Sequence, residues 1–503
     1  MAPRKIVPTL EDLSILTLQK LVNDVSDFMI KNDRTLDETS DLTEHFRVVL
    51  YDRTPWLLHN RIAELMLMAL SNLYHVYATK NSEISSKCET ILKLVLSAIP
   101  YPKLKKMSFN LWARPIQLLL LEFLGEMSNL EILNCDFKPT SKREASMVER
   151  ALLVSCHSFS NLVSFTFYAR CTDEILAAIC ENCKSVRRID VSHSRSVTDA
   201  SVKSLVLCQE LQKVELFETL VTRHGYYKLL TESKSPNLVD IGECSALPDV
   251  LKLMESSSVE FCPYQLPCLH SVCRCNRELS LVCKYFPNLT EFSLWFASDE
   301  PNLMCLSKLE NLKCLKLRSD VHITEPLCSF LSVKGWSITS LCLVGVHELR
   351  DTSIVNIAVS CPNIENLQFS PGWQYRATES PAIQLSPKPF QKLRKLVWES
   401  YFPSSFVEFI LNYAHNLETL RVRPSMFVTD QFLQSVFNCN PMKRLKELNL
   451  DHSNKLSAKM VRFMIINFEH ISYLAHFSIS LIKSEFESIE NFIVTNNYNV
   501  VLG

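Results

Sequence analysis

The chain has 503 residues, of which 47% are hydrophobic, and 53 Lys and Arg balance 54 Asp and Glu to a net charge of -1. This composition excludes a disordered or fibrous chain and gives no global field that would attract nucleic acid or anionic lipid. Only seven glycines occur, and neither G-x-G-x-x-G nor the P-loop pattern is present, so no phosphate cradle is expected. We expect no cofactor and no enzymatic activity.

The first hundred residues are predicted to be mainly helical. Residues 10–30 carry Leu and Val at helical spacing on one face. A polar linker over residues 31–41 separates them from a second helical stretch, 42–77, which restarts at Pro55, where proline fits a first helical turn. The chain begins without a signal-peptide profile and its apolar runs are short. We expect a cytoplasmic or nuclear protein that does not enter a membrane.

A repeat dominates the remainder of the chain. The pattern apolar-x-x-apolar-x-apolar recurs from Leu104 to Leu474 about every 26 residues, inside the range of leucine-rich repeats. Its end alternates like a strand with one buried face. Helical returns lie between the strands, and Asp199, Asp351 and Asp430 are predicted to accept the free N–H groups at their starts.

These patterns predict an α/β fold, a leucine-rich repeat solenoid with helices on the convex wall and a parallel sheet on the concave one. The predicted domains are a helical N-terminal region over 1–98, a solenoid of about 15 repeats over 99–490, and a tail over 491–503.

Cysteines are frequent but do not have the spacing of a metal site. The 19 cysteines are an odd number spread through the chain, which favours reduced, buried thiols. In the segment 261–283 only Cys273 and Cys275 are close, whereas zinc sites usually use paired C-x-x-C motifs. We therefore predict no metal, and interpret this segment as an irregular repeat.

The strand positions that alternate with the buried leucines are expected to face the concavity. Any one polar residue there can simply be a solvated surface, but an aromatic ring and several arginines on a rigid face together suit protein recognition. Trp373, in the loop 369–390, is added as a candidate. The predicted substrate-binding residues are Trp295, Lys316, Arg318, Gln368, Trp373, Arg421 and Arg423.

Two motifs at the N-terminus resemble those of ubiquitin-ligase receptors. Thr9, Leu10, Ser14 and Leu18 have the spacing of the BC-box that binds elongin C, with Ser14 where that family usually has Cys. Downstream, Thr54, Pro55 and Leu58 partly fill the cullin-box, with Thr54 in place of an aliphatic residue, and the same stretch resembles the opening of an F-box.

The repeats themselves resemble the cysteine-containing leucine-rich repeats of F-box and related receptors, with Cys183, Cys208, Cys361 and Cys439 near the ends of the helical returns. The layout of box-like helices before a long solenoid is similar to PRAME-type receptors. This resemblance implies that Thr9, Leu10, Ser14, Leu18, Pro55 and Leu58 bind an adaptor, either elongin B/C with a cullin or the F-box adaptor.

Two functions remain open from the sequence. In the first, the chain is the substrate-recognition subunit of a cullin–RING ubiquitin ligase and binds target proteins on its concave face. In the second, it is a leucine-rich repeat scaffold or regulatory protein whose N-terminal helices only cap the first repeat. The two differ in whether the face of the first helix that carries Leu10 and Leu18 is exposed or buried.

Overall fold

The structure is a computed structural model whose described residues fall into two compact units, Pro8–Met254 and Glu255–Gly503, taken separately here. The described residues are 59–77, 101–137, 140–257, 266–297, 301–319, 323–345, 351–370, 388–399, 404–423, 427–450, 456–475 and 483–502, with Thr17, Lys20, Asp24, Asp41, Glu44, Val48, Leu92, Lys93, Leu96, Ser97 and Ile99. No helix in these ranges is long and apolar enough to cross a membrane.

The N-terminal unit is a stack of strand–helix repeats. Its strands pair in parallel and in chain order: β1 (Lys106–Ser108), β2 (Ile132–Asn134), β3 (Ser164–Thr166), β4 (Arg188–Asp190) and β5 (Lys213–Glu215). The other elements are α3 (His59–Tyr77), η2 (Tyr101–Lys103), η3 (Phe109–Leu111), α5 (Arg114–Leu120), η4 (Leu121–Glu126), α6 (Lys142–Ser155), η5 (Cys156–Ser158), α7 (Asp173–Asn182), α8 (Asp199–Leu205), α9 (Arg223–Glu232), β6 (Glu243–Cys244) and α10 (Leu247–Ser256).

The C-terminal unit repeats this plan with longer strands. They are β7 (Cys268–Cys273), β8 (Glu291–Phe296), β9 (Cys314–Ser319), β10 (Ser340–Val344), β11 (Asn366–Ser370), β12 (Lys395–Glu399), β13 (Thr419–Arg423), β14 (Glu447–Leu450), β15 (Tyr473–Ala475) and β16 (Val501–Leu502). Its helices are α11 (Asn276–Tyr285), η6 (Leu303–Lys308), α12 (Thr324–Lys334), η7 (Gly335–Ser337), α13 (Asp351–Ser360), α14 (Ser404–Tyr413), α15 (Asp430–Cys439), α16 (Ala458–Asn467) and α17 (Lys483–Thr495).

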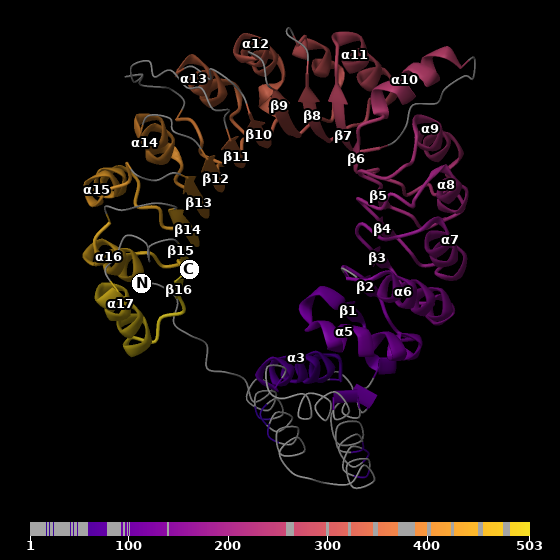
Figure 1. Cartoon of the computed structure of the whole chain (residues 1–503). Coiled ribbons are helices and arrows are strands. Elements are labelled where there is room, and N and C mark those ends of the chain that lie inside the picture. Colours follow the sequence, from indigo (N-terminus) through magenta and orange to yellow (C-terminus); the bar gives the residue numbers. More distant parts are fainter. Residues whose placement is uncertain are drawn as a thin grey trace. The chain divides into compact units, whose positions relative to one another are not determined.

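Within this unit the strands lie on the inner side of an arc and the helices on its outer side (Figure 1). The α/β class and the parallel sheets predicted from the leucine pattern are confirmed. Residues 491–502, which lie in the predicted tail of 491–503, complete α17 and add β16, whose Val501 and Leu502 pair with Tyr473 and Leu474 of β15. The pattern missed this strand because the segment lacks a full leucine repeat.

The core of each unit lies between its sheet and its helices. Most strands bury at least one residue there, such as Leu133, Phe165 and Val214 in the N-terminal unit. In the C-terminal unit, the indole of Trp398 is completely buried beside Phe369, with ring centroids 4.8 Å apart. The described cysteines are free thiols, and most are buried.

The helices start differently from the sequence prediction. Thr198 and Thr429, not Asp199 and Asp430, occupy the N-cap positions, and their hydroxyls accept the backbone N–H of Ala200 and Phe432. The cap prediction for the aspartates was therefore wrong, because the preceding threonine has the extended backbone that a cap needs. The side chain of Asp351 lies outside the described residues.

The aspartates instead connect neighbouring repeats. Asp199 accepts the backbone N–H of Thr222 at 2.7 Å and its hydroxyl at 2.6 Å. Asp430 does the same for Ser457, at 2.9 and 2.5 Å. Each carboxylate thus sits in the first turn of its own helix, where the dipole favours negative charge, and fixes the residue that caps the next helix.

Helix α3 packs onto the first repeat. Ile62, Met66 and Leu70 are at most 2% exposed, and the Ser71 hydroxyl accepts the backbone N–H of Ala113 at 2.9 Å. This helix directly follows the predicted cullin-box or F-box stretch, and its apolar face is already used inside the N-terminal unit. The described part of the N-terminal region therefore has a structural role of its own.

Candidate functional site

The polar positions of the C-terminal sheet form three rows across the strands. We call the face that carries them the open face. Parallel pairing aligns residues of neighbouring strands in each row, and in the third row the Ser370 hydroxyl donates to Glu399 where β11 meets β12. The first row contains Cys268, Glu291, Cys314, Ser340, Asn366, Lys395, Thr419, Glu447 and Tyr473; the second His270, Ser293, Lys316, Cys342, Gln368, Val397, Arg421 and Asn449; the third Val272, Trp295, Arg318, Val344, Ser370, Glu399 and Arg423.

The structure places six of the seven predicted substrate-binding residues on this face. Lys316, Gln368 and Arg421 share the second row, and the third row holds the rest of the six, which are Trp295, Arg318 and Arg423. Trp373 lies outside the described residues. Lys316, Arg318 and Arg421 are exposed, whereas Trp295, Gln368 and Arg423 are half-buried. Their role in binding stays a prediction.

One arginine is held in place by an aromatic neighbour. The guanidinium carbon of Arg318 lies 4.3 Å from the centroid of the Trp295 ring on the adjacent strand. This geometry is a cation–π contact, which stabilises the charge by about 0.5–1 kcal/mol where water has access. The Arg318 side chain is therefore ordered on the open face before any ligand arrives, and less conformational entropy is lost when it binds.

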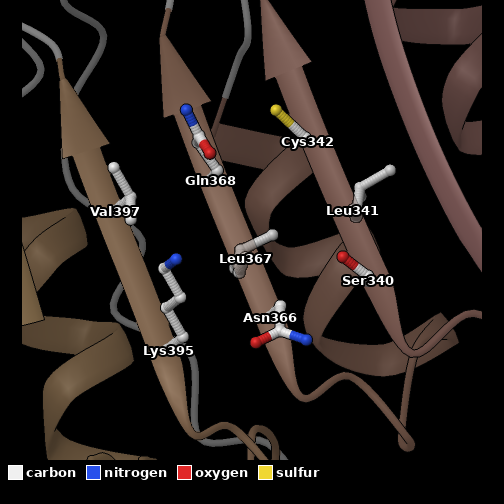
Figure 2. Close-up of a pocket in the computed structure, with 8 residues that line it drawn as sticks. All are labelled: Ser340, Leu341, Cys342, Asn366, Leu367, Gln368, Lys395 and Val397. Atoms are coloured by element: carbon white, nitrogen blue, oxygen red, sulfur yellow. The ribbon is translucent and has the colours of Figure 1, made fainter. Parts of the chain in front are cut away.

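Small side chains produce a hollow near the middle of the sheet. It has a volume of about 280 Å³ and is lined by Ser340, Leu341, Cys342, Asn366, Leu367, Gln368, Lys395 and Val397. Figure 2 shows Cys342, Gln368 and Val397 side by side on neighbouring strands, with Ser340, Asn366 and Lys395 forming a parallel line. The hollow exists because serine, cysteine and valine leave space between the longer side chains on either side.

A wider depression of about 580 Å³ extends from this part of the sheet towards β7, past Ser293 and Lys316 to Cys268 and His270. At that end the Sγ of Cys268 lies 3.5 Å from Nε2 of His270. Burial raises the pKa of the Cys342 and Cys314 thiols above the ordinary value. Both thiols are thus protonated and neutral near pH 7, and these two positions offer neutral hydrogen-bonding groups.

Three cations on the open face have no ion-pair partner among the described residues. Within the described part of the chain, Lys316 and Arg421 form no ion pair and Arg318 contacts only the Trp295 ring. Glu399, in contrast, accepts the Ser370 hydroxyl at 2.6 Å. Exposed cations without a partner are available for an anionic group from another molecule.

The sheet of the N-terminal unit neutralises part of its charge internally. Lys213 contacts Glu215 and Asp240, each at 2.8 Å. Burial works to lower the pKa of Lys213, but hydrogen bonds to the two carboxylates outweigh it and raise the pKa above its ordinary value. Tyr168 likewise donates to Asp190 at 2.9 Å, and burial followed by this bond raises its pKa to about 12. Lys106 and Arg188 on the sheet of the N-terminal unit are exposed and form no ion pair among the described residues, as Lys316 and Arg421 do not. The C-terminal face is the better candidate site because it also has a hollow and an arginine ordered by an aromatic ring.

Sequence reasoning found the charged residues of the site and one residue of its hollow, Gln368, but missed the rest of the lining. Ser340, Cys342 and Asn366 line the hollow and were not among the predicted residues, although they occupy the same strand positions. The signal was available: aligning the repeats would have shown a run of small residues between cationic strands. The predicted adaptor-binding residues, Thr9, Leu10, Ser14, Leu18, Pro55 and Leu58, all lie outside the described residues.

No family model and no curated protein matches the chain. Among solved structures it is similar to a chain in the Rad7 and Elc1 complex of yeast, with 13% identity and a TM-score of 0.43, covering 97% of this chain and 91% of that one. An internalin from Listeria monocytogenes has 12% identity and a TM-score of 0.32, and the match covers 65% of this chain and 86% of that one. A leucine-rich repeat protein of Leptospira interrogans has 12% identity and a TM-score of 0.31, and the match covers 79% of this chain and 94% of that one. None of these low identities and TM-scores assigns a function to this chain.

Proposed function

We propose that this chain is a non-enzymatic protein-binding protein whose open face holds a segment of a partner protein. The observation that carries the proposal is the set of exposed cations Lys316, Arg318 and Arg421, none of which has an ion-pair partner among the described residues. They surround a hollow on a sheet whose opposite side is a packed core. A rigid face with an ordered arginine and an aromatic ring is what a protein interface needs at its centre.

Site-specific crosslinking tests this proposal. A photo-crosslinking amino acid at Gln368, in the hollow, should attach a partner that then binds the purified chain. The matched control is Val359 on α13, which is 62% exposed and lies on the helical side. A partner that crosslinks at Val359 but not at Gln368 contradicts the proposal.

We further propose that the chain is the substrate-recognition subunit of a cullin–RING ubiquitin ligase. The support is the BC-box spacing of Thr9, Leu10, Ser14 and Leu18 ahead of a repeat array. Such a helix inserts its leucine into a groove of the adaptor. The receptor then acts by proximity, because holding the target raises the effective concentration of its lysines near the ubiquitin carrier.

Co-purification tests the adaptor step. Wild-type chain should retain elongin B/C, and Leu10→Ala should lose it. Thr17→Ala is the control, because Thr17 is helical and exposed but outside the motif. A wild-type chain that binds neither elongin C nor the F-box adaptor rules out the ligase proposal and leaves the open-face proposal standing.

The second candidate function is a scaffold or regulatory protein without an adaptor. The burial of Ile62, Met66 and Leu70 favours it, because α3 already covers the first repeat and needs no partner to bury its apolar face. In this case Leu10→Ala lowers the stability of the N-terminal unit and leaves partner binding at Gln368 unchanged. Chemical denaturation and the crosslinking assay together separate the two functions.

A further inference from the structure

The open face carries two pairs of cations at equivalent register. Lys316 and Arg318 lie on β9, and Arg421 and Arg423 occupy the same rows on β13. In the second row, strand pairing leads from Lys316 through Cys342, Gln368 and Val397 to Arg421. Four strand spacings of about 4.8 Å separate the two pairs by about 19 Å.

The region between the pairs is neutral in the second row and hollow. Cys342 is an uncharged thiol, Gln368 and Val397 carry no charge, and the space of about 280 Å³ lies among them. The hollow is large enough for one aliphatic side chain. Lys395 adds an exposed cation in the first row of β12, beside the strand that carries Arg421, whereas β10 and β11 carry no charged residue. The cations therefore gather at two ends, on β9 and on β12 with β13, so the face is complementary to anionic groups at two points rather than along a line.

A buried acceptor lies next to one cation pair. Asn449 is the second-row neighbour of Arg421 and is only 6% exposed. Its Oδ1 has no hydrogen-bond partner among the described residues. An unsatisfied buried carbonyl costs about 1–3 kcal/mol, so this atom favours a ligand that supplies an N–H group. A peptide backbone has such groups and a carboxylate or phosphate alone does not.

We propose that the open face binds an extended peptide segment with two anionic side chains about six residues apart and an uncharged, aliphatic-containing stretch between them. The spacing follows from the 19 Å separation, because an extended chain advances about 3.3 Å per residue. One anion meets Lys316 and Arg318, the other meets Arg421, and the central aliphatic side chain enters the hollow. This inference rests on the proposed protein-binding role and specifies the chemistry of the partner.

The same face disfavours a nucleic acid strand. Glu291 and Glu447 lie in the first row and Glu399 in the third, so carboxylates alternate with the cations. A polynucleotide presents a phosphate at every nucleotide and would place several of them against these carboxylates. Two separated anions on a peptide avoid that repulsion.

A peptide-binding experiment on the full chain tests the inference. The probes are fluorescein-labelled heptapeptides of the form Glu-x-x-x-x-x-Glu, with Ser, Thr, Val or Leu at each x. A second set has the same composition with the two Glu at positions one and three, and a third carries phosphoserine in place of Glu. Fluorescence anisotropy gives the dissociation constants, and the phosphoserine set shows which kind of anion binds more tightly.

The expected result is that the wide spacing binds at least tenfold more tightly than the narrow spacing. Lys316→Glu combined with Arg421→Glu should abolish this preference. The control is Lys443→Glu combined with Lys459→Glu, which reverses two exposed charges outside the strands and should leave binding unchanged. Unchanged denaturation midpoints show that both double variants fold.

Three outcomes overturn the inference: no peptide of the wide set binds, binding is independent of spacing, or a single-stranded oligonucleotide binds to the same residues as tightly as the best peptide. The protein-binding proposal is judged separately, by crosslinking at Gln368. If a partner attaches at Gln368 but its binding does not depend on the spacing of its acidic residues, the protein-binding proposal stands and the spaced-anion inference is refuted.

Discussion

Replacing Gly225 by alanine should destabilise the protein, although alanine is the better helix former. Gly225 lies inside α9, and a methyl group there would overlap the Asp199 carboxylate and lie 2.7 Å from Cγ1 of Val221. Asp199 holds the backbone N–H and hydroxyl of Thr222, the cap of α9. The methyl group therefore displaces the carboxylate that joins two repeats.

The magnitude follows from these contacts. The two hydrogen bonds to Asp199 are each worth about 1.5 kcal/mol, the lower end for a charged acceptor because they lie near the surface. Alanine returns about 1 kcal/mol of helix propensity. The net loss is about 2 kcal/mol, which lowers the melting temperature by roughly 4–8 °C for a unit of this size.

Chemical and thermal denaturation followed by circular dichroism measure this effect. Gly125→Ala is the matched control, because its methyl group would meet only the Ser155 hydroxyl at an ordinary 3.5 Å. The Gly225→Ala penalty should also shrink in an Asp199→Ala background, since the two sites share one interaction. If Gly225→Ala is as stable as the wild type, the carboxylate does not join the repeats as described.

Three further outcomes are expected. Burial works to raise the pKa of Asp173, but hydrogen bonds from Ser201 and Thr198 outweigh it and lower the pKa. The ionised carboxylate therefore stabilises the fold above the ordinary carboxyl pKa, and this stability is lost as the pH falls through the pKa of the folded state. The difference in unfolding free energy between wild type and Asp173→Asn should narrow on acidification. Trp398→Ala should cost about 3–5 kcal/mol in urea denaturation, because the indole is fully buried; a cost below 1 kcal/mol would contradict that packing. Gly335→Ala should cost about 1–3 kcal/mol in the same assay, because its methyl group would lie 2.5 Å from the backbone oxygen of Ser360. An unchanged unfolding free energy would show that Gly335 lies farther from this oxygen.

Much of the fold was predictable because the repeat pattern reflects one physical requirement. Each strand must bury alternate residues against its helix, so leucines such as Leu315 and Leu341 mark both the strand and its face. The same alternation placed Lys316 and Arg421 on the open face. The starts of the helices were harder to predict from the sequence, because Thr198 and Asp199 are both good capping residues and only the backbone conformation distinguishes them.

The centre of the site could not be found from the charged residues alone. The hollow depends on which small residues of different repeats align, and Cys342 and Gln368 become neighbours only through the register of β10 and β11. Likewise, the contact of Arg318 with Trp295 requires two strands in register. Which side Leu10 presents to a partner stays a prediction, because it lies outside the described residues.

The most direct test of the central claim fills the hollow without changing its charge. Gln368→Trp places a large ring among Ser340, Cys342 and Val397, and the affinity for a partner captured at this face is then measured with purified proteins. Binding should weaken at least tenfold, while Val359→Trp on the helical side has no effect and both variants keep the wild-type denaturation midpoint. Unchanged affinity of Gln368→Trp would contradict the assignment of the open face as the binding site.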